Sequence, residues 1–162
     1  MRIISLVGLG LLAPNVFALD THPNHGIQSP PIYILRTTQP ATTALGKALN
    51  TLGYRPAGDD QRIPSNTYTE VSSVAQFVEI TKSHSKAKFV VPQGSSQLKA
   101  EEDYVRFARA FLSEEKRSEE LLELDVLDLE GAAQAENWVV LCTFLGMGYS
   151  MVERLSLWHF PG

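Results

Sequence analysis

Short apolar runs separated by longer amphipathic stretches are the feature of this sequence that most restricts its fold. The runs cover residues 32–35 (IYIL), 88–92 (KFVVP) and 121–126 (LLELDV). Runs of this length, bounded by proline, glycine or polar residues, are typical of strands buried in a parallel sheet. Because helical stretches lie between them, the sequence predicts an α/β fold, a three-layer sandwich with a small, mostly parallel sheet.

Four stretches show the spacing of amphipathic helices. They cover residues 42–54, 70–87, 98–124 and 132–147. Thr42 or Thr43 is placed to cap the first of these helices, and Gly53 is placed to end it. Residues 55–68 are rich in Pro, Gly, Asn and Asp, so we expect a loop there.

The composition is that of a globular protein with one domain. The chain has 162 residues, 44% of them hydrophobic, and a formal net charge of −4. No long basic run occurs in it, so we expect no nucleic-acid partner. The single cysteine, Cys142, cannot form a disulfide within the chain, and its place on an apolar helix face predicts a core position.

The N-terminal stretch has the pattern of a secretory signal peptide. Arg2 precedes an apolar run over residues 3–12, and Ala18 ends a V-F-A cleavage pattern. We therefore expect a signal peptide over 1–18, a linker over 19–30, the α/β domain over 31–146 and a tail over 147–162 that packs on the domain. The run is too short for a membrane span, so the mature protein is expected to be secreted and extracellular.

The same stretch also matches strand plus G-x-G-x-x-A, the fingerprint of a dinucleotide-binding fold. That fingerprint requires a helix from the second glycine and a second strand after it. Pro14 interrupts the helix, and residues 21–31 (THPNHGIQSPP) occupy the place of the strand. This pattern favours the signal peptide. His22 and His25 in the linker have no third ligand nearby, so no metal site is predicted.

Three separated blocks, in the same order, resemble a known family. They are "TTALGKALNTLGY" from Thr42, "AKFVVPQGSS" from Ala87 and "LLELDV…NWVVLCTFLG" from Leu121. The chain is similar here to the fungal-type P-loop sulfotransferase-like proteins, as a shortened, degenerate member. The resemblance implies a P-loop-type sandwich and transfer of a sulfuryl group from 3′-phosphoadenosine 5′-phosphosulfate (PAPS).

The resemblance also places a donor site on this chain. The phosphate loop falls on Thr38, Gln39, Ala41, Thr42 and Thr43, and the contacts to the 3′-phosphate of the donor fall on Ser95 and Ser96.

The residues at these positions argue against donor binding. Gln39 stands where the family has a cation, and the loss of a charge-assisted contact costs about 1.5–3 kcal/mol. Pro40 removes a backbone N–H from the anion nest, and Ala41 replaces a glycine. Gln93 or Gly94 stands where the family has an arginine. We find no convincing general base, so no residue is assigned as catalytic.

Two hypotheses follow. The first is a secreted, catalytically inactive sulfotransferase-like protein that acts by binding an unknown protein or small molecule, an effector being one example, without a cofactor. The alternative is an active PAPS-dependent sulfotransferase with a non-standard loop, in which Thr42 and Thr43 hold the donor and Arg36 supplies the missing charge.

Overall fold

The computed structural model describes residues 30–58, 66–94, 99–127 and 129–161. The expected signal peptide and the linker up to residue 29 lie outside the described residues, and so do Ser95 and Ser96. Within the described part of the chain, no helix is long and apolar enough to cross a bilayer.

The centre of the fold is a parallel sheet of five strands in the order β2-β3-β1-β4-β5. The strands are β1 (Ile32–Leu35), β2 (Arg55–Pro56), β3 (Thr67–Val71), β4 (Lys88–Gln93) and β5 (Leu121–Asp125). The middle strand, β1, is buried along its whole length, as expected for a strand covered on both faces. The predicted α/β sandwich with a small, mostly parallel sheet is thus confirmed, and the described sheet is parallel throughout.

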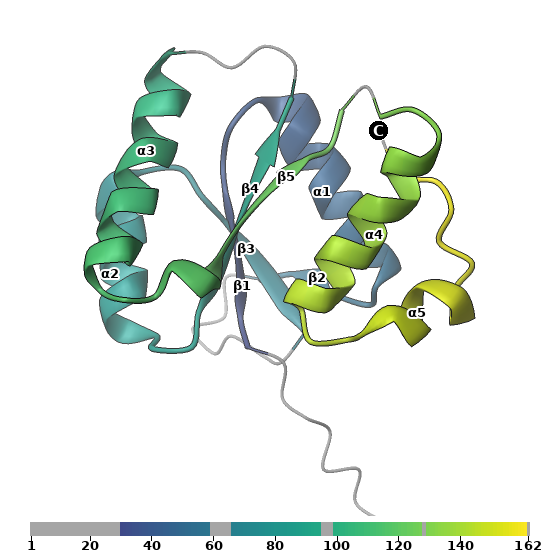
Figure 1. Ribbon diagram of the computed structural model, residues 1–162. Coiled ribbons are helices and arrows are strands. Elements are labelled where there is room, and N and C mark those ends of the chain that lie inside the picture. The colour runs from purple at the N-terminus through teal and green to yellow at the C-terminus, as the bar shows by residue number, and fades with distance from the viewer. Residues whose placement is uncertain (1–29, 59–65, 95–98, 128, 162) are drawn as a thin grey trace, which may run out of the picture.

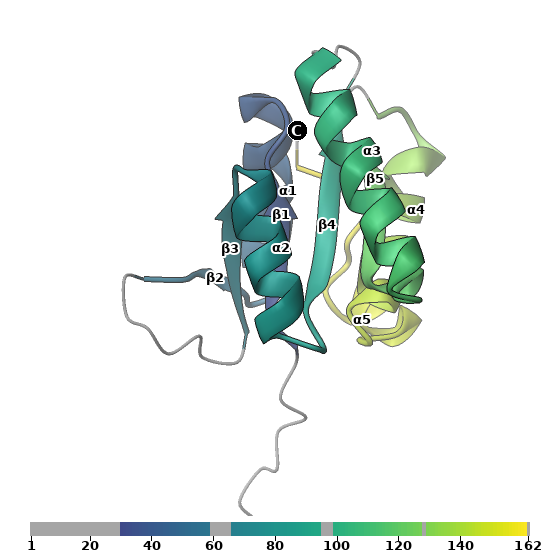
Figure 2. The same cartoon turned by 90° about the vertical axis from the view of Figure 1, so that its left-hand side faces the viewer.

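Helices cover both faces of the sheet, as Figure 1 shows with the sheet between two helical layers. One layer holds α1 (Gln39–Thr51), α4 (Ala132–Phe144) and the short α5 (Tyr149–Arg154). The other holds α2 (Val74–Ser83) and α3 (Lys99–Glu114), which lie in front of the sheet in Figure 2. A 3-10 turn, η1 (Ser118–Glu120), leads into β5.

Alternate residues of β1 divide the core into two parts. Ile32 and Ile34 face α1 and α4, where they pack with Val90 and Trp138. Tyr33 and Leu35 face α2 and α3 and pack in the other cluster. The second cluster is rich in aromatic rings: Phe77 meets Phe89 edge-on at a centroid distance of 4.9 Å.

Helix α1 begins earlier than the sequence indicated. We expected Thr42 or Thr43 as its cap, but the helix starts at Gln39 and is capped by Thr38, whose hydroxyl accepts from Ala41 N at 3.4 Å. Pro40 promotes this early start, because its fixed φ suits the first turn and its missing N–H would be unpaired there anyway. The predicted end is confirmed, since Gly53 has φ 89° and Tyr54 N bonds Leu49 O at 2.9 Å.

The segment before α2 was predicted wrongly. Residues 55–68 were expected to be a loop and 70–87 a helix, but β2 and β3 lie in this part of the chain and α2 begins only at Val74. The residues of β3, TYTEV, are mostly β-branched or aromatic and favour a strand. Ser73 then caps α2 by accepting from Gln76 N at 3.3 Å.

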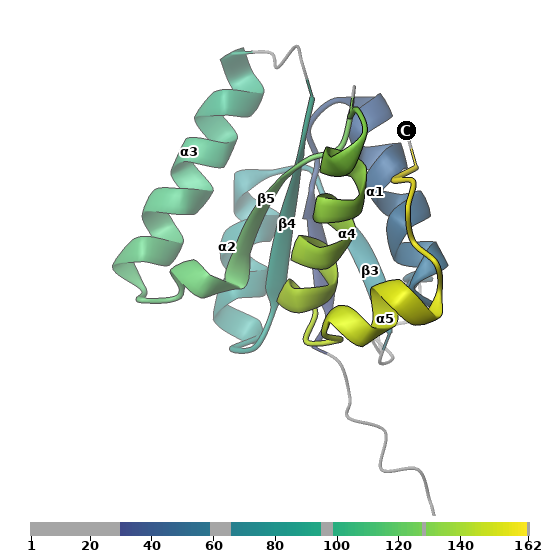
Figure 3. The same ribbon diagram turned by 45° about the vertical axis from the view of Figure 1, so that its right-hand side comes forward.

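The tail returns along the helical layer of α1 and α4. Figure 3 shows it as the yellow segment that follows α5. Leu157 and Phe160 are buried, and Phe160 lies 4.9 Å from the Trp138 ring. Trp138 Nε1 donates to His159 O at 3.1 Å. The tail is therefore part of the core packing on this face.

Arg117, in the turn after α3, ties the end of α2 to the rest of the second layer. Its guanidinium donates to Thr81 O at 2.7 Å and to His84 O at 3.1 Å, both at the C-terminal end of α2. Its Nε donates to Glu120 Oε2 at 2.7 Å. The side chain is only 17% exposed, so water cannot fully replace these bonds.

We predict that Arg117→Ala lowers the free energy of unfolding by about 2 kcal/mol, because it leaves two helix-end carbonyls without their charged donor. Denaturant unfolding followed by circular dichroism measures this change. Arg106→Ala is the matched control. Arg106 is 75% exposed and pairs only with Asp103, so its loss should cost less than about 0.5 kcal/mol. Equal effects of the two variants would contradict the proposed role of Arg117.

Candidate functional site

The carboxyl ends of the strands lie at one edge of the sheet, the upper edge in Figure 1. In folds of this kind, ligands bind outside this edge where the connections turn in opposite directions. Here that point lies between β1 and β4, since the chain moves from β1 toward β3 but from β4 toward β5. Residues 38–43 follow β1, and residues 95 and 96 follow β4, so the predicted donor positions flank this point in the chain.

A hydrogen bond closes the gap between β1 and β4. Thr37 Oγ1 donates to Pro92 O at 2.6 Å, and Thr37 is buried. The pairing of β1 with β4 ends at Ile34 and Val90. Pro92 therefore lies beyond the pairing with β1, although it still pairs with Leu124 of β5, and its missing N–H removes no hydrogen bond between β1 and β4. The side chain of Thr37 thus bridges the position between β1 and β4 where a ligand would enter in folds of this kind.

The turn between β1 and α1 is too short for a wide phosphate loop. Only residues 36–38 separate the two elements. Thr38 is half-buried, and its hydroxyl accepts from Ala41 N, which would otherwise be a free donor at the helix start. Thr42 N likewise bonds Thr38 O at 3.0 Å. These amides therefore donate to Thr38 within the first turn of the helix and do not form an open anion nest.

The remaining residues predicted for the donor loop point in different directions. Ala41 is fully buried and Thr42 is 1% exposed, so both face the core. Thr42 Oγ1 has no hydrogen-bond partner among the described residues. Gln39 and Thr43 are exposed and lie one turn apart, with Gln39 Nε2 donating to Thr43 Oγ1 at 3.4 Å. The structure brings these two together and separates them from Thr42.

Arg36 is the cation closest in sequence to the start of α1. It is exposed, and its backbone N–H donates to Val71 O at 2.9 Å on the β3 side. Its guanidinium has no ion-pair partner among the residues that the structure describes.

Beyond β4 the polar side chains near the carboxyl edge are paired with one another. Gln93 Nε2 donates to Glu123 Oε2 at 2.6 Å, and Arg109 binds both Glu123 oxygens at 2.8 Å through Nε and Nη2. The Gln93–Glu123–Arg109 set was not predicted, because its members come from β4, β5 and α3 and share no local pattern. Asp125, at the end of β5, is exposed. This side of the edge exposes the Asp125 carboxylate, and its Arg109 is already paired with Glu123, where the resemblance implies a 3′-phosphate.

Gly94 is, with Gln93, one of the two positions at which the resemblance implies an arginine. A Cβ on Gly94 would lie 2.7 Å from Leu127 Cδ1, so any larger side chain there requires Leu127 to move. Packing against Leu127 therefore leaves little room for a larger side chain at position 94.

Neither a metal site nor a reactive thiol is found in the described part of the chain. No group of three His, Cys, Asp or Glu side chains there is placed to hold a metal ion. Cys142 lies in the core on α4, as predicted from its position on an apolar face. Burial raises the pKa of its thiol, which disfavours the nucleophilic thiolate.

Comparisons with models of protein families, with curated proteins and with solved structures gave no match to this chain. The geometry of the carboxyl edge therefore carries the functional argument.

We predict opposite outcomes for two buried threonines at this edge. Thr37→Val removes the donor to Pro92 O and should lower the free energy of unfolding by about 1–3 kcal/mol, because a buried carbonyl loses its partner. Thr42→Val removes a hydroxyl that has no partner, so it should be neutral or stabilising. Thermal and denaturant unfolding of the two variants tests this. A greater loss in Thr42→Val than in Thr37→Val would contradict the assigned hydrogen bonding.

Proposed function

We propose that this protein is a secreted, sulfotransferase-like scaffold that acts by binding and does not transfer sulfuryl groups. One observation carries the proposal: α1 begins at Gln39, directly after a three-residue turn, so that residues the family uses to hold phosphate are wound into a helix here. A nest needs several N–H groups free to converge on one anion. In this chain Ala41 N and Thr42 N already bond to Thr38.

The electrostatics of the edge support the same proposal. A donor such as PAPS carries several negative charges, and binding sites for it require cations or free N–H groups. Gln39 is neutral, Arg109 is held by Glu123, and Asp125 adds an exposed carboxylate. Each missing charge-assisted contact costs about 1.5–3 kcal/mol. The loss of two such contacts corresponds to at least about a hundredfold weaker donor binding.

Secretion, if the expected signal peptide is used, would also separate the protein from a donor that is made inside cells. A protein with this scaffold and without this chemistry is suited to recognise a protein or small molecule. An effector role is one form that such recognition takes.

The exposed Arg36 is the observation that favours the alternative, an active PAPS-dependent sulfotransferase. It lies two residues before the cap of α1, and its guanidinium has no ion-pair partner among the described residues. In that hypothesis Arg36 would supply the positive charge that the family has at position 39. Thr43 would supply a hydroxyl from the exposed side of the first turn.

Titration of the full chain with adenosine 3′,5′-bisphosphate, the product of the donor, tests the proposal. We predict no saturable heat in calorimetry up to about 1 mM nucleotide, because the edge lacks the contacts that compensate for desolvating the phosphates. Micromolar binding that is lost in Arg36→Ala would establish the alternative. Lys82→Ala is the matched control, because Lys82 is an exposed cation in the last turn of α2, away from the carboxyl edge of the sheet.

A further inference from the structure

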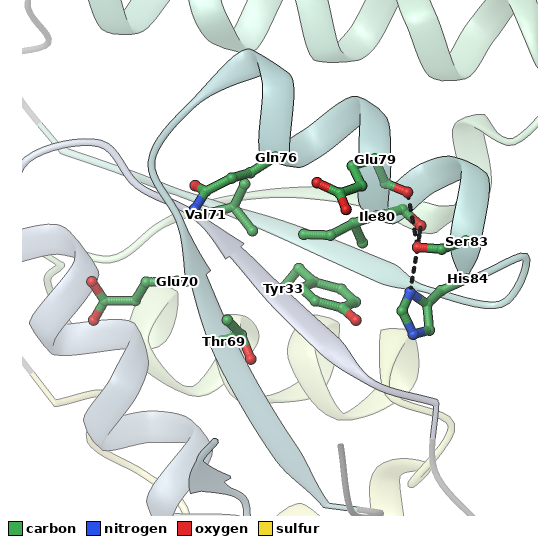
Figure 4. A pocket seen from close by; sticks show the side chains of 9 residues that line it. All are labelled: Tyr33, Thr69, Glu70, Val71, Gln76, Glu79, Ile80, Ser83 and His84. Carbon is green, nitrogen blue, oxygen red and sulfur yellow. Dashed lines mark hydrogen bonds between the residues drawn. The ribbon is translucent and has the colours of Figure 1, made fainter. Parts of the chain in front are cut away.

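A groove lies on the other side of the fold from α1, between α2 and the strands β3 and β1. Its volume is about 300 Å³, the lower end of the range for small-molecule sites. Figure 4 shows the residues that line it. They are Tyr33, Thr69, Glu70, Val71, Gln76, Glu79, Ile80, Ser83 and His84. None of these belongs to the donor positions at the carboxyl edge.

The inner end of the groove is formed by Tyr33, whose hydroxyl is buried and unpaired within the described part of the chain. The residue is 1% exposed, and its hydroxyl has no hydrogen-bond partner among the described residues. An unpaired buried hydroxyl costs about 1–3 kcal/mol relative to a bonded one, so a partner from outside would be stabilised there. Burial also raises the pKa of this phenol, which keeps it protonated as a donor. In Figure 4 its oxygen points toward His84.

His84 supplies an acceptor opposite this hydroxyl. Ser83 Oγ lies 2.8 Å from Glu79 O and 2.9 Å from His84 Nδ1. A carbonyl can only accept, so the one hydroxyl hydrogen goes to Glu79 O and Ser83 Oγ accepts from Nδ1. We therefore assign the proton of the neutral imidazole to Nδ1, which leaves Nε2 as an acceptor. The rings of Tyr33 and His84 are 6.0 Å apart between centroids, and the two groups are not bonded to each other.

The charge of the groove is negative. Two carboxylates, Glu70 and Glu79, line it, and neither lysine nor arginine does so. Glu79 is exposed and has no ion-pair partner among the described residues. Its carboxylate lies above the groove in Figure 4, whereas the carboxylate of Glu70 points away on the other side of β3. Glu79 is one turn, about 6 Å, from Ser83 along α2.

From this arrangement we infer that the groove binds a small protonated amine that carries a hydroxyl group, such as a phenolic amine. The ammonium pairs with Glu79, and the apolar body lies on Ile80 and Val71. The ligand hydroxyl accepts from Tyr33 and donates to His84 Nε2. Anions are disfavoured by the carboxylate of Glu79. The inference goes beyond the proposed function and does not depend on it, since it involves neither the donor positions nor their chemistry.

Tyramine is the probe for this site, with two matched ligands. Phenethylamine lacks only the hydroxyl, and 3-(4-hydroxyphenyl)propionate keeps the phenol but replaces the amine by a carboxylate. We expect tyramine to cause saturable NMR shifts in the amides of Ile80, Ser83 and His84 of the full-length chain, with a Kd of about 0.1–1 mM. Phenethylamine should bind about fivefold more weakly, and the propionate should not bind measurably.

Three variants connect these effects to the groove. Tyr33→Phe should weaken tyramine binding about fivefold and leave phenethylamine binding unchanged. Its melting temperature should not fall, because the lost hydroxyl has no partner among the described residues. Glu79→Gln should weaken both amines about five- to tenfold. Glu70→Gln is the control with the same chemical change, and it should alter neither affinity by more than about twofold.

The inference is wrong if tyramine gives no saturable shift at about 10 mM, far above the expected Kd. It is also wrong if tyramine and phenethylamine bind equally, or if Glu70→Gln has the effect expected of Glu79→Gln. Any of these results would leave the proposed function standing, because the bisphosphate titration tests a different edge of the sheet.

Discussion

The burial of β1 is the constraint around which this fold is built. All four of its residues pair with β3 on one side, three of them pair with β4 on the other, and both of its faces are covered by helices. A strand in this position must be apolar throughout, and its two sets of side chains must begin two separate cores. Everything that bears on function starts at its ends or on its faces: the turn into α1, the bridge from Thr37 to Pro92, and the hydroxyl of Tyr33.

The end of β1 is the part of the fold that bears most directly on the proposed absence of donor binding. In this scaffold a ligand would enter outside the strand ends, between β1 and β4. Thr37 bridges that position, and the early start of α1 consumes the amides that would face an anion. The Thr37 hydroxyl and the amides of Ala41 and Thr42 at this edge are therefore bonded within the protein. Among the described residues, buried hydroxyls without a partner are found both at Thr42, in the first turn of α1, and at Tyr33, beside α2.

Much of the architecture was predictable because it depends on local patterns. The strands at 32–35, 88–92 and 121–126 and the glycine end of α1 were found from apolar runs and turn residues. The strand β3 was missed, because five residues with two threonines and a glutamate carry a weak hydrophobic signal. For the candidate site, the sequence showed which residue types occupy the donor positions. It did not show which of these side chains face the core and which face the solvent. Thr38 was assigned to a phosphate loop and proved to be the helix cap.

The sequence by itself determined the class of fold and the absence of a cation at Gln39, because periodicity and charge are properties of single residues and their neighbours in the chain. Only the tertiary structure decided which hydroxyls are used. Thr37, Thr42 and Tyr33 are all buried, yet within the part of the chain that the structure describes only the Thr37 hydroxyl has a partner, which comes from a position 55 residues away. Hydrogen-bond satisfaction depends on which strands become neighbours, and no local pattern encodes that.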